Sequence, residues 1–157
     1  TVLSADIRGF ATLAEHQLPS DVIALLNRLI GEMAHAVEGR GGRVAAVQTD
    51  GIIALFGMGG KARAGGRAAI HAAADMLKAM NLVNKDVSNS LPLPVRVGIG
   101  VHSGPVLLSR ADDSFSGQRL VVVGEAVIVA SRLEEMTKEL AADCIVSSKT
   151  IALAGFT

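Results

Sequence analysis

The sequence has very few cysteine and aromatic residues. Its 157 residues include one cysteine, no tryptophan and no tyrosine, and aromatic side chains make up 3% of the chain. The lone Cys144 excludes an internal disulfide and any metal site built from several thiolates. It lies in the apolar run 144–146, where we expect a buried, unreactive thiol. Half of the residues are hydrophobic, so the core must be built from aliphatic side chains.

The chain also lacks an excess of either charge and a long hydrophobic run. Fifteen Lys and Arg balance fifteen Asp and Glu, which disfavours nucleic acid as a partner because its binders carry a basic excess. No run of about 18 apolar residues suggests a membrane span, and no signal peptide is visible at Thr1. We expect a single domain, residues 1–157, that is part of a longer protein. We expect it in the cytoplasm, or at the cytoplasmic face of a membrane protein whose other domains carry the anchor.

Apolar periodicity predicts alternating strands and helices. Because two hairpins interrupt the alternation, the pattern favours an α+β sandwich with helices covering a mostly antiparallel sheet. The Asp50-Gly51 pair lies between two short apolar runs and is a strong hairpin signal. We expect strands at 1–5, 43–47, 52–56, 95–101, 120–123 and 145–146, helices at 22–37, 67–82 and 125–140 with another starting at 151–153, and connections at 57–66, 84–94 and 112–118.

Three motifs invite a functional reading that their context does not support. The stretch 57–61 is rich in glycine and ends in lysine, but Ala62 follows where a phosphate-binding loop needs Ser or Thr. Gly98 and Gly100 lie inside a predicted strand, so they are not a dinucleotide fingerprint, which marks a strand-to-helix turn. The four histidines show no metal-ligand spacing.

Two aspartates stand at positions suited to metal binding. Asp6 follows the first predicted strand, and Asp50 lies at the hairpin tip. Mg²⁺ is usually bound through one or two carboxylates together with substrate phosphates. Adjacent Gly9 and Gly51 leave the backbone free to approach phosphate oxygens. Taken alone, the spacing favours structural roles, since Asp-Gly is ordinary hairpin chemistry and Asp6 could cap the next helix.

Four segments, taken in order, resemble the catalytic domain of class III adenylate and guanylate cyclases. Each segment alone is a weak match, but together they are specific and cover nearly the whole chain. They are the strand and turn at 2–10 with the first aspartate, the hairpin and strand at 50–57 with the second, the long strand at 95–106, and the late helix at 123–134.

The resemblance implies a ferredoxin-like βαββαβ core and a dimer, joined head to tail with active sites at its interface. It implies conversion of a nucleoside triphosphate, ATP ahead of GTP, to a 3′,5′-cyclic nucleotide and pyrophosphate in intracellular signalling. By the same resemblance Asp6, Asp50 and the Ile7 carbonyl would hold two Mg²⁺ or Mn²⁺ ions. Backbone groups of Gly9 and Phe10 would lie near the phosphates.

The late helix keeps one family residue, while three other family positions are changed. Arg132 matches the family's transition-state arginine, whose cationic fork suits phosphate oxygens. The purine-reading Lys is replaced by Ala46, the second base-reading residue by Val121, and the ribose-orienting Asn by Ile128. Each change removes a hydrogen-bonding group, and a buried polar group left unpaired costs about 1–3 kcal/mol.

Three interpretations follow from this incomplete set. The domain is an active cyclase with a degenerate base site, or the metal-bearing half of a heterodimeric cyclase, or a catalytically silent regulatory or dimerisation module with the cyclase fold. Asp6 and Asp50 argue against the silent module, and the three apolar positions argue against an active homodimer. An unrelated ligand-binding domain of ferredoxin-like fold would share the topology. It would leave the two aspartates unexplained.

Overall fold

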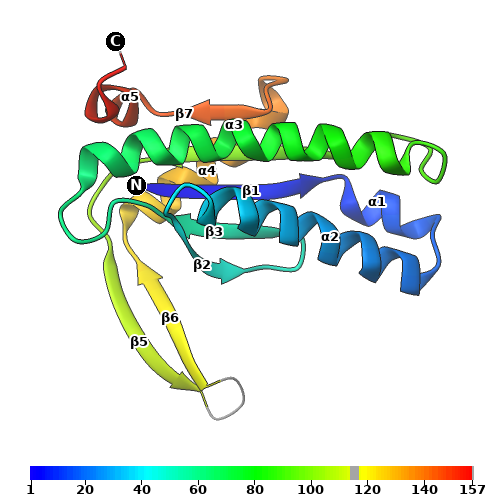
Figure 1. Ribbon diagram of the computed structural model, residues 1–157, viewed down its shortest axis with the longest axis horizontal. Helices are drawn as coiled ribbons and strands as arrows, with labels where there is room; N and C mark the ends of the chain where they lie inside the picture. The colour runs from blue at the N-terminus through cyan, green and yellow to red at the C-terminus, as the bar shows by residue number, and fades with distance from the viewer. Residues whose placement is uncertain (114–116, 157) are drawn as a thin grey trace.

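The fold is built around one five-stranded sheet with strand order β2-β3-β1-β4-β7. The computed structural model describes residues 1–113 and 117–156 (Figure 1). The strands pair antiparallel except for β4 and β7, which are parallel. The predicted α+β class with a mostly antiparallel sheet is therefore confirmed. The strands are β1 (Val2–Arg8), β2 (Arg43–Val47), β3 (Gly51–Leu55), β4 (Arg96–His102) and β7 (Cys144–Val146).

Helices cover both faces of the sheet. The two long helices α2 and α3 pack on one face, α4 packs on the other, and α5 lies against α3 (Figure 1). The main core lies between the sheet and the α2–α3 layer, and its side chains are almost all aliphatic, as the composition predicts. The helices are α1 (Phe10–Glu15), α2 (Pro19–Glu38), α3 (Ala62–Val87), α4 (Glu125–Glu139) and α5 (Ser148–Ala154).

Side chains of β1 alternate between the two layers, as a strand's period of two requires. Leu3, Ala5 and Ile7 point into the main core, whereas Val2 belongs to the smaller cluster beneath α4. Asp6 is four residues after Val2 on the same strand, so both side chains point to the face of the sheet that α4 covers. This places the candidate metal aspartate on the side of the sheet that the late helix covers.

Glycines of β4 let α4 approach the sheet closely. A Cβ atom at residue 100 would lie 2.1 Å from the Ala130 carbonyl oxygen and 2.4 Å from the Glu134 nitrogen. The glycine at this position is therefore a packing requirement, because only glycine leaves room for the helix backbone. This explains the Gly98-Ile99-Gly100 motif in structural terms.

The strands β5 (Leu107–Asp113) and β6 (Gly117–Val123) form a separate antiparallel hairpin that extends away from the sheet (Figure 1). We predicted β6 in part, did not predict β5, and expected a loop at 112–118 that overlaps the ends of both strands. Part of that segment, residues 114–116, lies outside the described residues. The prediction failed because polar residues in an exposed hairpin do not show the apolar alternation of a half-buried strand.

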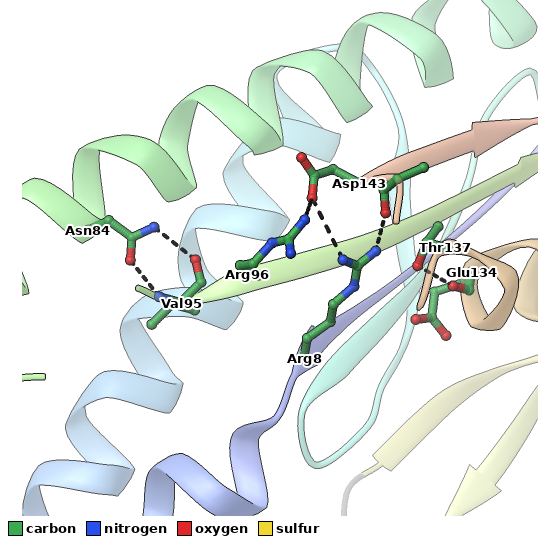
Figure 2. A network of polar contacts seen from close by, with 8 residues as sticks. Arg8, Asn84, Val95, Arg96, Glu134, Thr137 and Asp143 are labelled. Carbon is green, nitrogen blue, oxygen red and sulfur yellow. Dashed lines mark hydrogen bonds and ion pairs between the residues drawn. The ribbon is translucent and has the colours of Figure 1, made fainter. Parts of the chain in front are cut away.

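Helix α3 is longer at both ends than the predicted helix at 67–82. The helix includes Gly65, a position that requires glycine because a Cβ atom there would lie 2.4 Å from the Gly57 Cα atom. At the other end Asn84 donates to the Val95 carbonyl over 2.8 Å and accepts from the Val95 nitrogen over 2.7 Å (Figure 2). The predicted connections at 57–66 and 84–94 are correspondingly shorter.

Among the described residues, no helix is both long and apolar enough to cross a membrane.

Candidate active site

The hairpin between β2 and β3 brings Asp50 to Asp6. Gly51 pairs with Asp6 across β1 and β3, and the Ile7 nitrogen donates to the Asp50 carbonyl oxygen over 2.8 Å. The nearby Asp50 carboxyl helps to raise the pKa of Asp6. Two aspartates 44 positions apart in the sequence thus form one aspartate pair, which lies between β1 and the β2–β3 hairpin.

Asp6 lies in a strongly perturbed electrostatic environment. The pKa of Asp6 is raised from 3.8 to about 7, first by burial, then by the hydrogen bond from Asp50 and its charge, and also by the charge of Glu134. Lys138 acts in the opposite direction. In the absence of a cation, the pair therefore keeps a proton up to nearly neutral pH. A divalent cation at the pair would take the place of that proton.

The turn after β1 adjoins this pair. Gly9 has a left-handed backbone (φ 64°), and no atom lies within 4 Å of the place its Cβ would occupy. Ile7 is buried in the main core, and Phe10 begins α1 and packs against that core. Phe10 also lines a cavity of about 360 Å³ between α1, α2 and the end of α3, which does not include the aspartates.

Arg132 does not face the aspartates of its own chain. The buried residues of α4 are Ala126, Ala130, Glu134 and Thr137, which face the sheet. Arg132 lies two positions from two of them, on the opposite side of the helix. Its side chain is 69% exposed and pairs with Glu135 over 3.1 Å. One chain alone therefore does not bring together the predicted metal residues and the predicted arginine.

The three changed family positions carry accessible apolar side chains. Ala46 is exposed on β2 at a register shift against β3, Val121 is half-buried on β6, and Ile128 is 70% exposed. Ile128 is one turn from Arg132 on the outer face of α4. Val47 and Val123 add exposed apolar surface on the same strands, β2 and β6.

The sequence reading did not identify Glu134. It is a buried charged residue, 6% exposed, whose charge acts on Asp6. The sequence contained a signal for it, because Ala126, Ala130, Glu134 and Thr137 recur at helical spacing. A glutamate within an otherwise small and apolar stripe indicates a buried charge that needs an explanation.

The residues present suit a cation that the substrate helps to bind. Within residues 1–113 and 117–156, no group of three or more His, Cys, Asp and Glu side chains forms a complete metal site. A pair of carboxylates is nevertheless what Mg²⁺ commonly uses when phosphate oxygens supply further ligands. The donor set, all oxygen, also suits Mn²⁺.

Comparison with known proteins identifies the family. Residues 1–154 match the family described as adenylate and guanylate cyclase catalytic domain. The chain belongs to this family. An adenylate cyclase of Anabaena cylindrica is 32% identical over 161 residues, which cover 96% of this chain and 30% of that protein. The chain thus spans less than a third of that relative's length.

Solved cyclase structures have the same fold. The crystal structure of the guanylyl cyclase Cya2 superimposes with a TM-score of 0.85 at 28% identity, over 98% of this chain and 77% of that one. The non-canonical dimeric guanylyl cyclase domain of the RhoGC fusion protein from Blastocladiella emersonii gives a TM-score of 0.79 at 21% identity, over 98% and 82%. The cyclase fold inferred from the four sequence segments is confirmed.

Proposed function

We propose that this cyclase-family domain converts a nucleoside triphosphate to a 3′,5′-cyclic nucleotide and pyrophosphate, with weak discrimination between bases. The observation that carries the proposal is that strand pairing brings Asp50 beside Asp6, since Gly51 pairs with Asp6 and the Ile7 nitrogen donates to the Asp50 carbonyl oxygen. Its alternatives are the metal-bearing half of a heterodimeric cyclase and a catalytically silent module. The accessible apolar positions Ala46, Val121 and Ile128 favour these alternatives.

The proposed chemistry assigns a role to each part of the turn. Asp6, Asp50 and the Ile7 carbonyl would hold Mg²⁺ or Mn²⁺, an ion that would supply Lewis-acid chemistry at the ribose 3′-hydroxyl and would neutralise phosphate charge. The backbone of Gly9 and Phe10 lies beside the phosphates, where its N–H groups stabilise negative charge. The left-handed Gly9 keeps that approach free of side chains.

Arg132 is proposed to act on the active site of a second subunit. It lies on the face of α4 that points away from its own aspartates, so it reaches a substrate only across an interface. In a dimer joined head to tail, the Arg132 guanidinium would meet the developing charge on the reacting phosphate.

The base is proposed to be held by shape and apolar contact. Without polar side chains at Ala46 and Val121, the polar groups on the base edge stay unpaired on binding, at about 1–3 kcal/mol each. Guanine presents an exocyclic carbonyl and an amino group, whereas adenine presents only an amino group. ATP is therefore proposed as the preferred substrate over GTP, by a small factor.

The expected cytoplasmic location stays a prediction.

Turnover with Mn²⁺ and each nucleotide tests the proposal. We expect slow formation of cyclic nucleotide, slightly faster from ATP, that the double variant Asp6→Ala, Asp50→Ala abolishes. Brisk, strongly ATP-selective turnover would contradict our account of the base site. No turnover, together with turnover on mixing with a cyclase chain that carries the missing Lys, Asp and Asn, would identify the heterodimer instead.

Restoring the three polar residues gives a sharper second arm. The triple variant Ala46→Lys, Val121→Asp, Ile128→Asn should raise turnover by a factor of about 10² if the metal residues are competent, since correct positioning of a reacting group is worth that much. If the wild-type and the triple variant are both inactive and neither binds Mn²⁺ with nucleotide, the domain is a silent module.

A further inference from the structure

A buried glutamate on α4 lacks a partner for one of its oxygens. Glu134 is 6% exposed, and its Oε1 atom is buried with no hydrogen-bond partner among the described residues. Figure 2 shows Glu134 beside Thr137 on α4, where the Thr137 hydroxyl donates to the backbone carbonyl of Glu134 and leaves the carboxylate unbound. A buried ionisable group without a partner lowers stability. Folding alone therefore does not account for this residue.

The unpartnered oxygen lies next to the strand position opposite Asp6. Gly98 pairs with Asp6 across β1 and β4, and a Cβ at residue 98 would lie 2.8 Å from Glu134 Oε1. The same point is 3.4 Å from the Nε atom of Arg8, which is also buried and unpartnered among the described residues. Arg8 extends instead to Asp143 and to the Ala142 carbonyl (Figure 2).

The three carboxyl groups are electrostatically linked. The negative charge of Glu134 contributes to the raised pKa of Asp6. The pKa of Glu134 is itself raised, mainly by burial. The charges of Lys138 and Arg8 lower it, and those of Glu135 and Asp50 raise it. Like charges held close together repel one another and attract a cation more strongly than two charges do.

We propose that Glu134 is a positioning residue of the active site, which strengthens divalent-cation binding at Asp6 and Asp50 through its charge and its place against Gly98. The inference rests on the proposed function, since it presumes that the aspartate pair holds the ion. Partners that lie behind metal ligands in this way change metal affinity by about 10- to 100-fold when they are removed. Glu134 acts at the lower end of that range because it makes no direct hydrogen bond to a ligand.

Mn²⁺ affinity and thermal stability, measured on the same variants, test this role. In Glu134→Gln the shape is kept and the charge is lost, so we expect Mn²⁺ to bind about tenfold more weakly in the presence of a non-hydrolysable nucleoside triphosphate. The Tm should stay equal or rise, because a buried charge has been removed. Glu139→Gln makes the same charge change at an exposed position of α4 and should alter neither quantity.

A variant that should strengthen Mn²⁺ binding distinguishes an effect of charge from a loss of folding. Lys138 lowers the pKa of Asp6, so Lys138→Gln should tighten Mn²⁺ binding by about twofold, a small effect because an exposed charge is screened. Unchanged Mn²⁺ affinity in Glu134→Gln would overturn the proposal, and so would weaker affinity accompanied by a lower Tm, which indicates a structural role. Wild-type binding that survives the double variant Asp6→Ala, Asp50→Ala would overturn the proposed function as well.

Discussion

At the scale of single residues, the close approach of the β2–β3 hairpin to Asp6 depends on the absence of a side chain at Gly51. A Cβ there would lie 2.3 Å from the Ala5 carbonyl oxygen and 2.8 Å from Asp6 Oδ1. Both atoms belong to β1, so a side chain would push the hairpin away from Asp6. The Asp-Gly pair therefore serves the site in two ways, because the first residue supplies a carboxylate and the second lets it approach.

We predict that Gly51→Ala destabilises the domain by about 1–3 kcal/mol, the usual cost of overpacking a tight contact. It should also weaken Mn²⁺ binding, because β1 and the hairpin separate. Urea unfolding measures the first effect and calorimetry the second. Gly31→Ala is the matched control, since no atom lies within 4 Å of a Cβ in that helix position. Equal behaviour of the two variants would contradict the role given to Gly51.

The raised pKa of Asp6 predicts how the stability of the metal-free domain depends on pH. Because the folded state has a pKa of about 7 against an ordinary value of 3.8, the folded domain binds a proton between these values that the unfolded chain does not. The contribution of Asp6 to stability is therefore favourable at low pH and is lost as pH rises through about 7. Asp6→Asn should remove this contribution. Thermal unfolding of both proteins at pH 5 and pH 8 checks it, and parallel pH profiles would count against it.

At the scale of elements, the glycines of β4 set the distance between α4 and the sheet. Helix α4 carries Glu134 toward the aspartates of its own chain, and Arg132 and Ile128 away from them. A single rigid helix thus places residues of two different sites. A shift of α4 relative to β4 would therefore disturb both sites.

We predict that Gly100→Ala displaces α4, because the new methyl group would collide with backbone atoms of that helix. The expected loss of stability is about 1–3 kcal/mol, with weaker Mn²⁺ binding as Glu134 moves from Asp6. Gly66→Ala adds a methyl to another buried glycine, but at an ordinary 3.5 Å from Ala154 Cβ. Chemical denaturation should show that the free energy of unfolding of Gly66→Ala is unchanged or slightly higher, as expected when alanine replaces glycine in a helix. A harmless Gly100→Ala would refute this view of α4.

Elements with strong local signals were predicted from the sequence. The Asp-Gly hairpin, the apolar strands and the helical repeat of α2 follow from short-range patterns, and the family segments gave the fold. The strand β5 and the ends of α3 were not predicted, because exposed polar residues obey no apolar period. Glu134 was missed because its significance comes from the pairing of Asp6 with Gly98, which only the register of β1 and β4 reveals.

At the scale of the whole molecule, the proposed site needs residues from two chains. The aspartate pair lies on the sheet side of α4, and Arg132 lies on the outer side, so no single chain presents both to one substrate. The apolar side chains left exposed on β2, β6 and α4 suit burial against a second subunit. We therefore expect the smallest competent unit to be a dimer, with one chain's aspartates facing the other's arginine.

This arrangement predicts complementation between two inactive variants. Asp6→Ala, Asp50→Ala removes one half of each site, and Arg132→Ala removes the other, so each homodimer should be inactive. In an equal mixture, half of the dimers contain both variants, and each of these has one intact site of two, which gives about a quarter of wild-type turnover. If the aspartates and Arg132 instead acted within one chain, no dimer in the mixture would hold an intact site, and turnover would stay at zero. Cyclic nucleotide formation on mixing therefore distinguishes a shared site from a self-contained one, because only a shared site can be rebuilt from two broken chains.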